Sequence, residues 1–85
     1  MTGLRLTLKR HWFDQIVSGK KTVEYREIKP YWEARLEWGG RVRRFNRIEF
    51  RNGYHAGART VTVECLGITK NLQSGFYEIR LGSIF

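Results

Sequence analysis

Apolar and polar residues alternate in four separate segments of this chain, and that pattern limits the fold to one built mainly from β-strands. The apolar members are Leu4, Leu6 and Leu8; Ile48 and Phe50; Val61, Val63 and Cys65; and Tyr77, Ile79 and Leu81. Because side chains two residues apart point to the same face of a strand, each segment offers one apolar face to a core. The third segment continues on the opposite phase with Leu66 and Ile68, which predicts a bulge or bend near Cys65–Gly67.

A short helix is predicted after the first strand, in "RHWFDQIVSG". Its residues Trp12, Phe13, Ile16 and Val17 fall on one helical face. Trp12 and Phe13 are therefore predicted to lie in the core. Gly19 suits the position just past the end of this helix, where a left-handed backbone is common.

The next two segments are predicted to be a strand, "KKTVEYREI", and a second helix, "PYWEARLEW". Pro30 begins this helix, Gly39-Gly40 ends it, and Trp32 and Leu36 form its buried face. The resulting order, β-α-β-α-β-β-β, predicts a single α+β domain over residues 1–85, a small mixed β-barrel with two short helices.

Basic residues outnumber acidic ones by sixteen to eight, which gives the 85-residue chain a net charge of +8 and a pI near 10.3. Nucleic acid is the favoured partner for such a charge, and neither predicted helix has the long apolar face that a membrane surface requires. The alternative is that the charge keeps the protein soluble. A basic stretch is interpreted as a groove wall that follows a nucleic-acid backbone; it contains Arg41, Arg43, Arg44, Arg47 and Arg51.

Cysteine and histidine are too few for an internal disulfide or a Cys/His zinc site, since the chain has one cysteine, Cys65, and two histidines, His11 and His55. Neither a metal nor a cofactor is predicted. The chain has no signal-peptide pattern and no apolar run near 18 residues, so no membrane association is predicted and a cytoplasmic location is the default expectation.

The most informative stretch is "GKKTVEYREIKPYW", Gly19 to Trp32, which is dense in charges and aromatic rings. Thr22, Glu24 and Arg26 are two residues apart, so a regular strand places them on one face. Glu24 could orient Arg26 toward a phosphate, and the alternative is a purely structural Glu24–Arg26 pair. Lys21 follows the first helix and is predicted to project into the same cleft, either as a phosphate contact or as a catalytic base.

The constellation Gly19-x-Lys21-x-x-Glu24-x-Arg26 resembles the G-x-K-x-x-E-x-R signature of the activating-signal-cointegrator-homology (ASCH) domains, members of the PUA-like superfamily. "LKRHWFDQIVSGKKTVEYREIKPYW" is similar to the start of the compact bacterial and phage ASCH proteins, and "FRNGY" and "FYEIRLG" are similar to later blocks. The resemblance implies a PUA-like mixed β-barrel of five to six strands, a cleft between barrel and helices, and an RNA- or nucleotide-related role.

One small bacterial relative in this family hydrolyses N4-acetylcytidine with a lysine, a threonine and a glutamate. Its lysine corresponds to Lys21, its threonine falls at the position of Glu24, and its glutamate lies in an insertion for which this chain has no room between Ile68 and Phe76. Two of the three catalytic roles are therefore unmatched.

The predicted function is the binding of RNA or a modified nucleotide in a basic cleft, where aromatic side chains such as Tyr25 and Tyr31 stack on unpaired bases. The predicted binding residues are Lys20, Lys21, Glu24, Tyr25, Arg26, Lys29, Tyr31, Arg47, Arg51, Asn52 and Tyr54. One alternative is a hydrolase, either an N4-acetylcytidine amidohydrolase or a ribonuclease, with Lys21, Glu24 and Thr22 as catalytic residues. The other is a protein-interaction module. The oligomeric state is not defined by the sequence.

Overall fold

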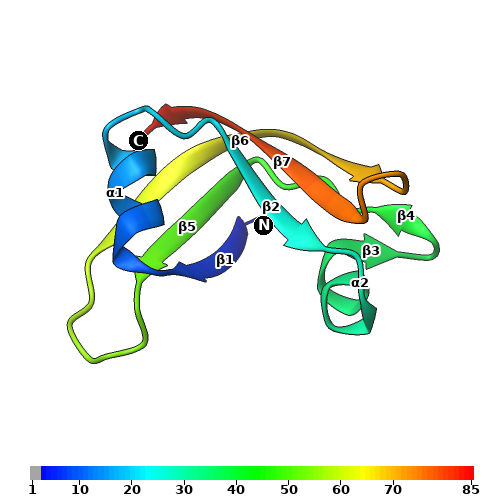
Figure 1. Ribbon diagram of the computed structural model, residues 1–85, viewed down its shortest axis with the longest axis horizontal. Helices are drawn as coiled ribbons and strands as arrows, with labels where there is room; N and C mark the ends of the chain where they lie inside the picture. Colours follow the sequence, from blue (N-terminus) through cyan, green and yellow to red (C-terminus); the bar gives the residue numbers. More distant parts are fainter. Residues whose placement is uncertain (1–2) are drawn as a thin grey trace.

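The computed structural model describes residues 3–85, and its centre is a curled five-stranded sheet (Figure 1). The strands are β1 (Gly3–Leu8), β2 (Val23–Glu27), β5 (Arg47–Asn52), β6 (Thr60–Asn71) and β7 (Phe76–Ile84), in the order β1-β5-β6-β7-β2. β1 pairs with β5 in parallel and the other neighbours are antiparallel. The predicted α+β class and mixed sheet are therefore confirmed.

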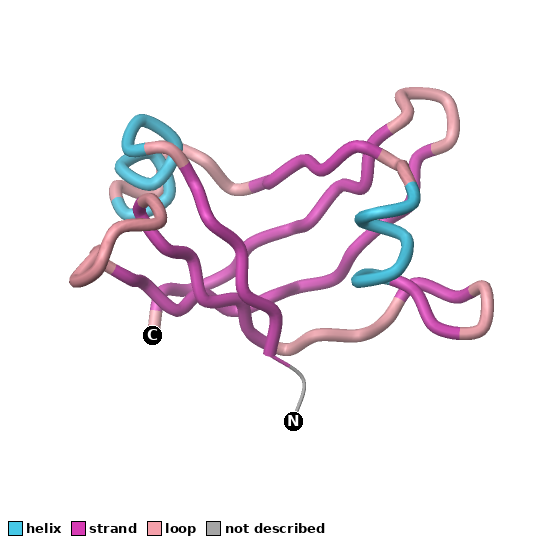
Figure 2. Tube along the Cα trace, turned by 90° about the horizontal axis from the view of Figure 1, so that it is seen from below, coloured by secondary structure: helices cyan, strands magenta, loops and turns pink. Residues whose placement is uncertain are grey.

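Two helices lie at opposite ends of the sheet (Figure 2). α1 (Arg10–Val17) connects β1 to β2, and α2 (Pro30–Leu36) follows β2. Neither of these helices, in the described part of the chain, has the length and apolar character needed to cross a membrane. β1 and β2 are the two edges of the sheet, and Arg26 Nη2 of β2 donates to the Thr7 carbonyl of β1 at 3.4 Å. The curl therefore brings the two edge strands near each other.

The core lies on the concave face of the sheet, and the alternation in the sequence predicts it well. Nearly all of the residues assigned inward are buried, and Val61 alone is only partly buried. The buried set is Leu4, Leu6, Leu8, Ile48, Phe50, Val63, Cys65, Tyr77, Ile79 and Leu81, joined by Phe13, Ile16, Leu36 and Phe45. The predicted bulge is also present, because the β6–β7 register shifts between Val63 and Cys65 and again between Cys65 and Gly67.

The prediction that Trp12 lies in the core is wrong, because its side chain is 47% exposed. α1 has only eight residues and packs through one narrow face, which buries Phe13 and Ile16. Trp12 and Val17 lie at the margins of that face. The predicted second helix is also too long. The chain turns to extended backbone at Glu37 instead of continuing as a helix to Trp38.

The two glycines that were predicted to end the second helix instead form the turn of a small hairpin. β3 (Glu37–Trp38) pairs with β4 (Arg41–Val42), and Gly39 and Gly40 have φ angles of 55° and 77°. Two consecutive left-handed residues are what a tight two-residue hairpin turn requires. The hairpin adds two short strands that the predicted order did not contain.

The Glu37 side chain, just after α2, contacts two side chains of the large sheet, Tyr77 and Lys70. Tyr77 donates its hydroxyl to the Glu37 carboxylate, and Lys70 Nζ lies 2.8 Å from Glu37 Oε2 and 3.4 Å from Glu33 Oε2. The hydrogen bonds from Lys70 and Tyr77 hold the pKa of Glu37 below its ordinary value of 4.5. The carboxylate thus anchors the end of α2 to β6 and β7.

This lowered pKa predicts an acid-sensitive contribution to stability. A carboxyl group with a depressed folded-state pKa stabilises the protein above its unfolded-state pKa, and the contribution is lost as the pH falls through the folded-state value. We expect the free energy of unfolding, measured in urea, to fall more steeply below about pH 5 in wild type than in Glu37→Gln. Glu33→Gln is the control, because Glu33 makes only the longer contact with Lys70. Equal acid sensitivity of wild type and Glu37→Gln would contradict this assignment.

Candidate functional site

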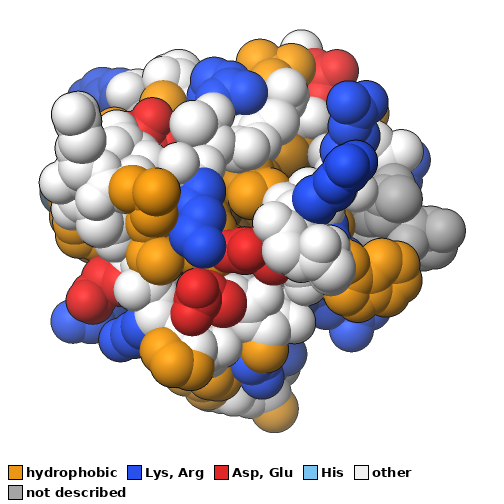
Figure 3. Space-filling model, turned by 90° about the vertical axis from the view of Figure 1, so that its right-hand side faces the viewer, with side chains coloured by type: hydrophobic (Ala, Val, Ile, Leu, Met, Phe, Trp, Pro, Cys, Tyr) orange, Lys and Arg blue, Asp and Glu red, His pale blue; other side chains and the backbone are white. Residues whose placement is uncertain are grey.

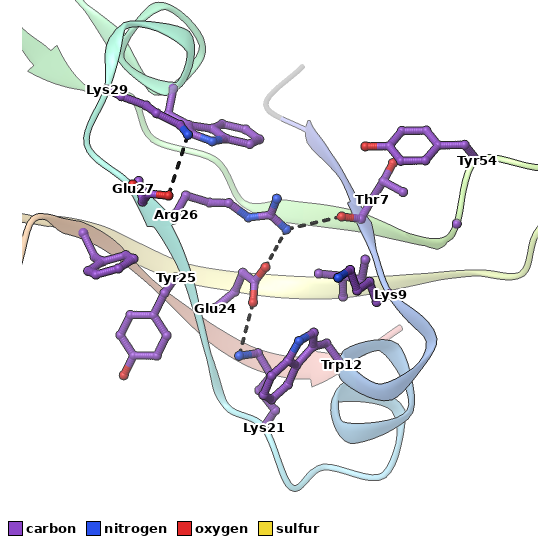
Figure 4. Close-up of a pocket in the computed structure, with 14 residues that line it drawn as sticks. Thr7, Lys9, Trp12, Lys21, Glu24, Tyr25, Arg26, Glu27, Lys29 and Tyr54 are labelled. Atoms are coloured by element: carbon purple, nitrogen blue, oxygen red, sulfur yellow. Dashed lines mark hydrogen bonds and ion pairs between the residues drawn. The ribbon is translucent and has the colours of Figure 1, made fainter.

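A pocket of about 830 Å³ opens between the two edge strands of the sheet, with α1 and α2 at its ends (Figure 4). Its volume lies within the roughly 300–1,000 Å³ that is usual for small-molecule sites. The lining residues are Thr7, Leu8 and Lys9; Trp12; Lys21; Glu24, Tyr25, Arg26 and Glu27; Lys29 and Trp32; Gly53 and Tyr54; and Phe76.

Three charged side chains meet in this pocket. Glu24 is only 5% exposed, and its carboxylate lies between two cations. Lys21 Nζ is 3.2 Å from Glu24 Oε1, and Arg26 Nη2 is 2.5 Å from Glu24 Oε2 (Figure 4). The side chains of Lys21 and Arg26 are themselves only 16% and 17% exposed. The trio of Lys21, Glu24 and Arg26 therefore carries one net positive charge in a largely enclosed position.

The local backbone explains why Lys21 reaches this carboxylate. Gly19 has a φ of 79°, which is the left-handed conformation predicted for the end of α1. The Lys21 N–H then donates back to the Gln15 carbonyl, so that the chain turns sharply toward β2. Glu24 and Arg26 share the concave face of β2, since their partners on β7 are the buried Ile79 and Tyr77.

Aromatic rings stand beside both cations. Lys21 Nζ lies 4.7 Å from the ring centroid of Trp12 and 5.6 Å from that of Tyr25, and the Arg26 guanidinium lies 5.0 Å from the Trp32 ring. All three distances are within the roughly 6 Å range of a cation–π interaction. The walls of the pocket thus combine flat apolar surface with positive charge.

Arg26 retains an unused donor. Within residues 3–85, its Nε is the buried side-chain nitrogen without a hydrogen-bond partner, although Nη2 donates to both Glu24 and the Thr7 carbonyl. A buried donor without a partner is energetically unfavourable and calls for an explanation such as a water or a ligand. Both Glu24 oxygens are engaged by cations, so the charged trio offers donors rather than acceptors to an incoming molecule.

The structure places about half of the predicted site residues in the pocket. Lys21, Glu24, Tyr25, Arg26, Lys29 and Tyr54 line it. Lys20, Thr22, Tyr31, Arg47, Arg51 and Asn52 do not.

Three of the residues outside the pocket have other contacts. Arg51 donates to the carbonyls of Gly53 and His55, so it braces the loop after β5. The Arg47 guanidinium lies 5.3 Å from the Phe85 ring. Tyr31 packs edge-on against Trp32 at 4.9 Å, outside the pocket. Arg47 and Arg51 of the predicted basic stretch therefore lie outside the pocket.

Sequence reasoning missed several lining residues, of which Trp12 and Thr7 matter most. Trp12 was assigned to the core because it neighbours Phe13 in an apolar helical face. Its position at the margin of that face was a signal that it could border a cleft. Thr7 contributes through its backbone carbonyl, which no side-chain pattern reveals.

No group of three or more His, Cys, Asp or Glu side chains within residues 3–85 is arranged to hold a metal ion. Comparison of the chain with protein-family models gives no match, and comparison with curated proteins gives none either.

Proposed function

We propose that this chain is an ASCH domain with a PUA-like barrel, and that its pocket binds one unpaired RNA nucleotide. The observation that carries the proposal is the arrangement of Lys21 and Arg26 on a single buried carboxylate beside aromatic rings. One net positive charge and an unused guanidinium donor suit a ligand that presents acceptors, such as a phosphate or the edge of a base. The rings of Trp12, Tyr25 and Trp32 suit the flat face of that base.

Binding is favoured over hydrolysis as the role of this pocket. Thr22 is exposed and does not line it, so the hydroxyl considered as a nucleophile is not near Lys21 and Glu24 in the cleft. Both Glu24 oxygens are engaged by Lys21 and Arg26, so the carboxylate is already occupied within the protein. The proposed mechanism is therefore recognition: Glu24 fixes the two cations, and the cations and rings hold the nucleotide.

The test is the affinity of the protein for labelled single-stranded RNA and for nucleoside 5′-monophosphates, measured by fluorescence anisotropy and calorimetry. We expect Arg26→Met to raise the dissociation constant at least tenfold, equivalent to about 1.4 kcal/mol, because it removes the guanidinium donors and the net positive charge of the trio. Arg10→Met is the matched control. It makes the same substitution on α1 at a side chain that is 87% exposed, and its affinity should stay within about twofold of wild type.

Two results would count against the proposal. Equal weakening by Arg26→Met and Arg10→Met would show that RNA binds the general charge of the protein and not the pocket. Absence of any binding by wild type at low salt would exclude an RNA role, since the electrostatic part of nucleic-acid affinity is largest there.

A further inference from the structure

A second hollow lies on another part of the molecule, between the segment that follows β4 and the bulge of β6. Its volume is about 350 Å³, and its charged lining residues are Arg43, Arg44 and Arg80. The lining set contains no acidic residue. The bulge that the sequence predicts near Gly67 thus forms one wall of a basic hollow.

The charge of this hollow is not neutralised by the protein. Among the described residues, none of the three arginines has a carboxylate oxygen within 4.0 Å, whereas six other cations, such as Arg5 and Lys29, do. The carboxylates of the nearby α2–β3 segment, Glu33 and Glu37, are both engaged by Lys70. Three guanidinium groups around one small hollow repel each other, so an anion bound there would be favoured.

Two of these arginines are held in place. Arg43 Nη1 donates to the Arg35 carbonyl at 3.2 Å, and its guanidinium lies 4.6 Å from the Trp38 ring and 4.8 Å from the Phe45 ring. Arg80 Nη1 donates to Thr69 Oγ1 at 2.7 Å. Side chains that are already ordered lose less conformational entropy when they bind.

Gly67 gives the Arg80 guanidinium its place. Its φ is +141°, and a Cβ at this position would lie 2.6 Å from Arg80 Nη2. Any other residue would therefore displace the guanidinium. The position of the Arg80 side chain thus depends on the glycine in the bulge of β6.

An exposed aromatic ring lies beside the hollow. Trp38, at the tip of the β3–β4 hairpin, is 73% exposed, and it contacts Arg43, which also lines the hollow. Figure 3 views the end of the molecule that carries α2 and this hairpin, where basic and hydrophobic side chains lie next to each other on the surface. Proteins that bind single-stranded nucleic acids commonly combine clustered cations with an adjacent aromatic ring.

We propose that this hollow binds a backbone phosphate of single-stranded RNA while the neighbouring base stacks on Trp38. The inference rests on the proposed function, and it extends it: the natural ligand is a polymer that contacts both the pocket and the hollow. An acidic protein segment would satisfy the arginines equally well, but RNA supplies a flat base for the exposed indole ring next to each phosphate.

The experiment compares a 12-nucleotide single-stranded RNA with a nucleoside 5′-monophosphate and with inorganic polyphosphate. At about 3.4 Å per nucleotide in a stacked strand, twelve nucleotides extend roughly 40 Å. The longest dimension of the protein is 35 Å, so this RNA is long enough to reach both sites. The variants are Arg44→Ala/Arg80→Ala and Trp38→Ala, with Arg10→Ala/Arg59→Ala as a control that removes the same charge from residues lining neither site.

We expect Arg44→Ala/Arg80→Ala to weaken the 12-nucleotide RNA about tenfold and to reduce the slope of log affinity against log salt by about 0.7 per lost phosphate contact. Monophosphate binding in the pocket should stay within about twofold of wild type. Trp38→Ala should weaken the RNA about fivefold or more and change polyphosphate binding less than twofold, because stacking needs a base and Arg43 keeps its contacts with the Arg35 carbonyl and the Phe45 ring. The single variant Arg44→Ala, at an exposed residue, serves if the double variant fails to fold.

Three other outcomes would overturn one or both of the proposals. If Arg26→Met weakens RNA binding but Arg44→Ala/Arg80→Ala matches its control, the second site is wrong and the proposed function stands. If wild type binds neither RNA nor monophosphate, both proposals fail. If Arg44→Ala/Arg80→Ala weakens RNA and polyphosphate equally and Trp38→Ala has no effect, the hollow is an anion site for a partner other than RNA.

Discussion

Replacing Glu24 with glutamine is expected to lower the free energy of unfolding by about 2–3 kcal/mol. The carboxylate is the shared partner of Lys21 and Arg26, and its loss leaves two cations unpaired beside each other in an enclosed site. Removing one partner of a fully buried ion pair costs about 3–5 kcal/mol, and the partial exposure of the two cations reduces that figure. For a domain of this size the melting temperature should fall by about 10–20 °C, measured by calorimetry or circular dichroism.

Glu27→Gln is the matched control for this experiment. The substitution is the same and lies on the same strand, but the Glu27 side chain is 64% exposed and its ion pair with Lys29 spans 3.7 Å. An exposed pair of this kind contributes at most about 1 kcal/mol. Similar stability losses in the two variants would mean that Glu24 does not organise the pocket.

The same substitution should strengthen the binding of small anions. Without Glu24 the trio carries two positive charges in place of one, so inorganic phosphate should bind more tightly to Glu24→Gln than to wild type, as measured by calorimetry. A general loss of structure would not explain a variant that is less stable than wild type and yet binds phosphate more tightly. A parallel loss of both would instead indicate that the variant is misfolded.

The fold could be predicted largely from the sequence, because period-two alternation reports directly which side chains face a core. Leu4, Ile48, Val63 and Tyr77 lie in four different strands, and all are buried as their patterns predict. The hairpin at Gly39-Gly40 was missed because two glycines end a helix and turn a hairpin equally well. The end of the helix at Glu37 is fixed by contacts of its side chain with Tyr77 and Lys70, which are more than thirty residues away in sequence.

The candidate site was predictable where it follows strand geometry and unpredictable where it depends on the curl of the sheet. Glu24 and Arg26 share a face because they are two residues apart, and Lys21 joins them through the turn after Gly19. Thr7 enters the pocket only because the two edge strands approach each other. Arg47 lies in the same basic stretch as Arg43 but does not line the hollow that Arg43 lines, because the chain enters β5 between them.

The triple variant Lys21→Met/Glu24→Leu/Arg26→Met separates stability from function most sharply. Replacing a buried charged cluster with apolar residues of similar volume is often neutral or stabilising by about 1–4 kcal/mol. We therefore expect the triple variant to be at least as stable as wild type in urea denaturation, and at least 2 kcal/mol more stable than Glu24→Gln. The unpartnered Arg26 Nε supports this expectation, because a buried donor without an acceptor is itself destabilising.

Nucleotide binding by this stable triple variant should be undetectable, because no charged donor of the trio remains in the pocket. Glu27→Leu/Lys29→Met, which removes the more exposed ion pair at the pocket margin, is the control and should reduce affinity only a few-fold. A triple variant less stable than Glu24→Gln would contradict the prediction and assign the trio a structural role in joining the edge strands β1 and β2. A stable triple variant without affinity would instead mean that the charges are retained for the ligand, at a net cost in the free energy of folding.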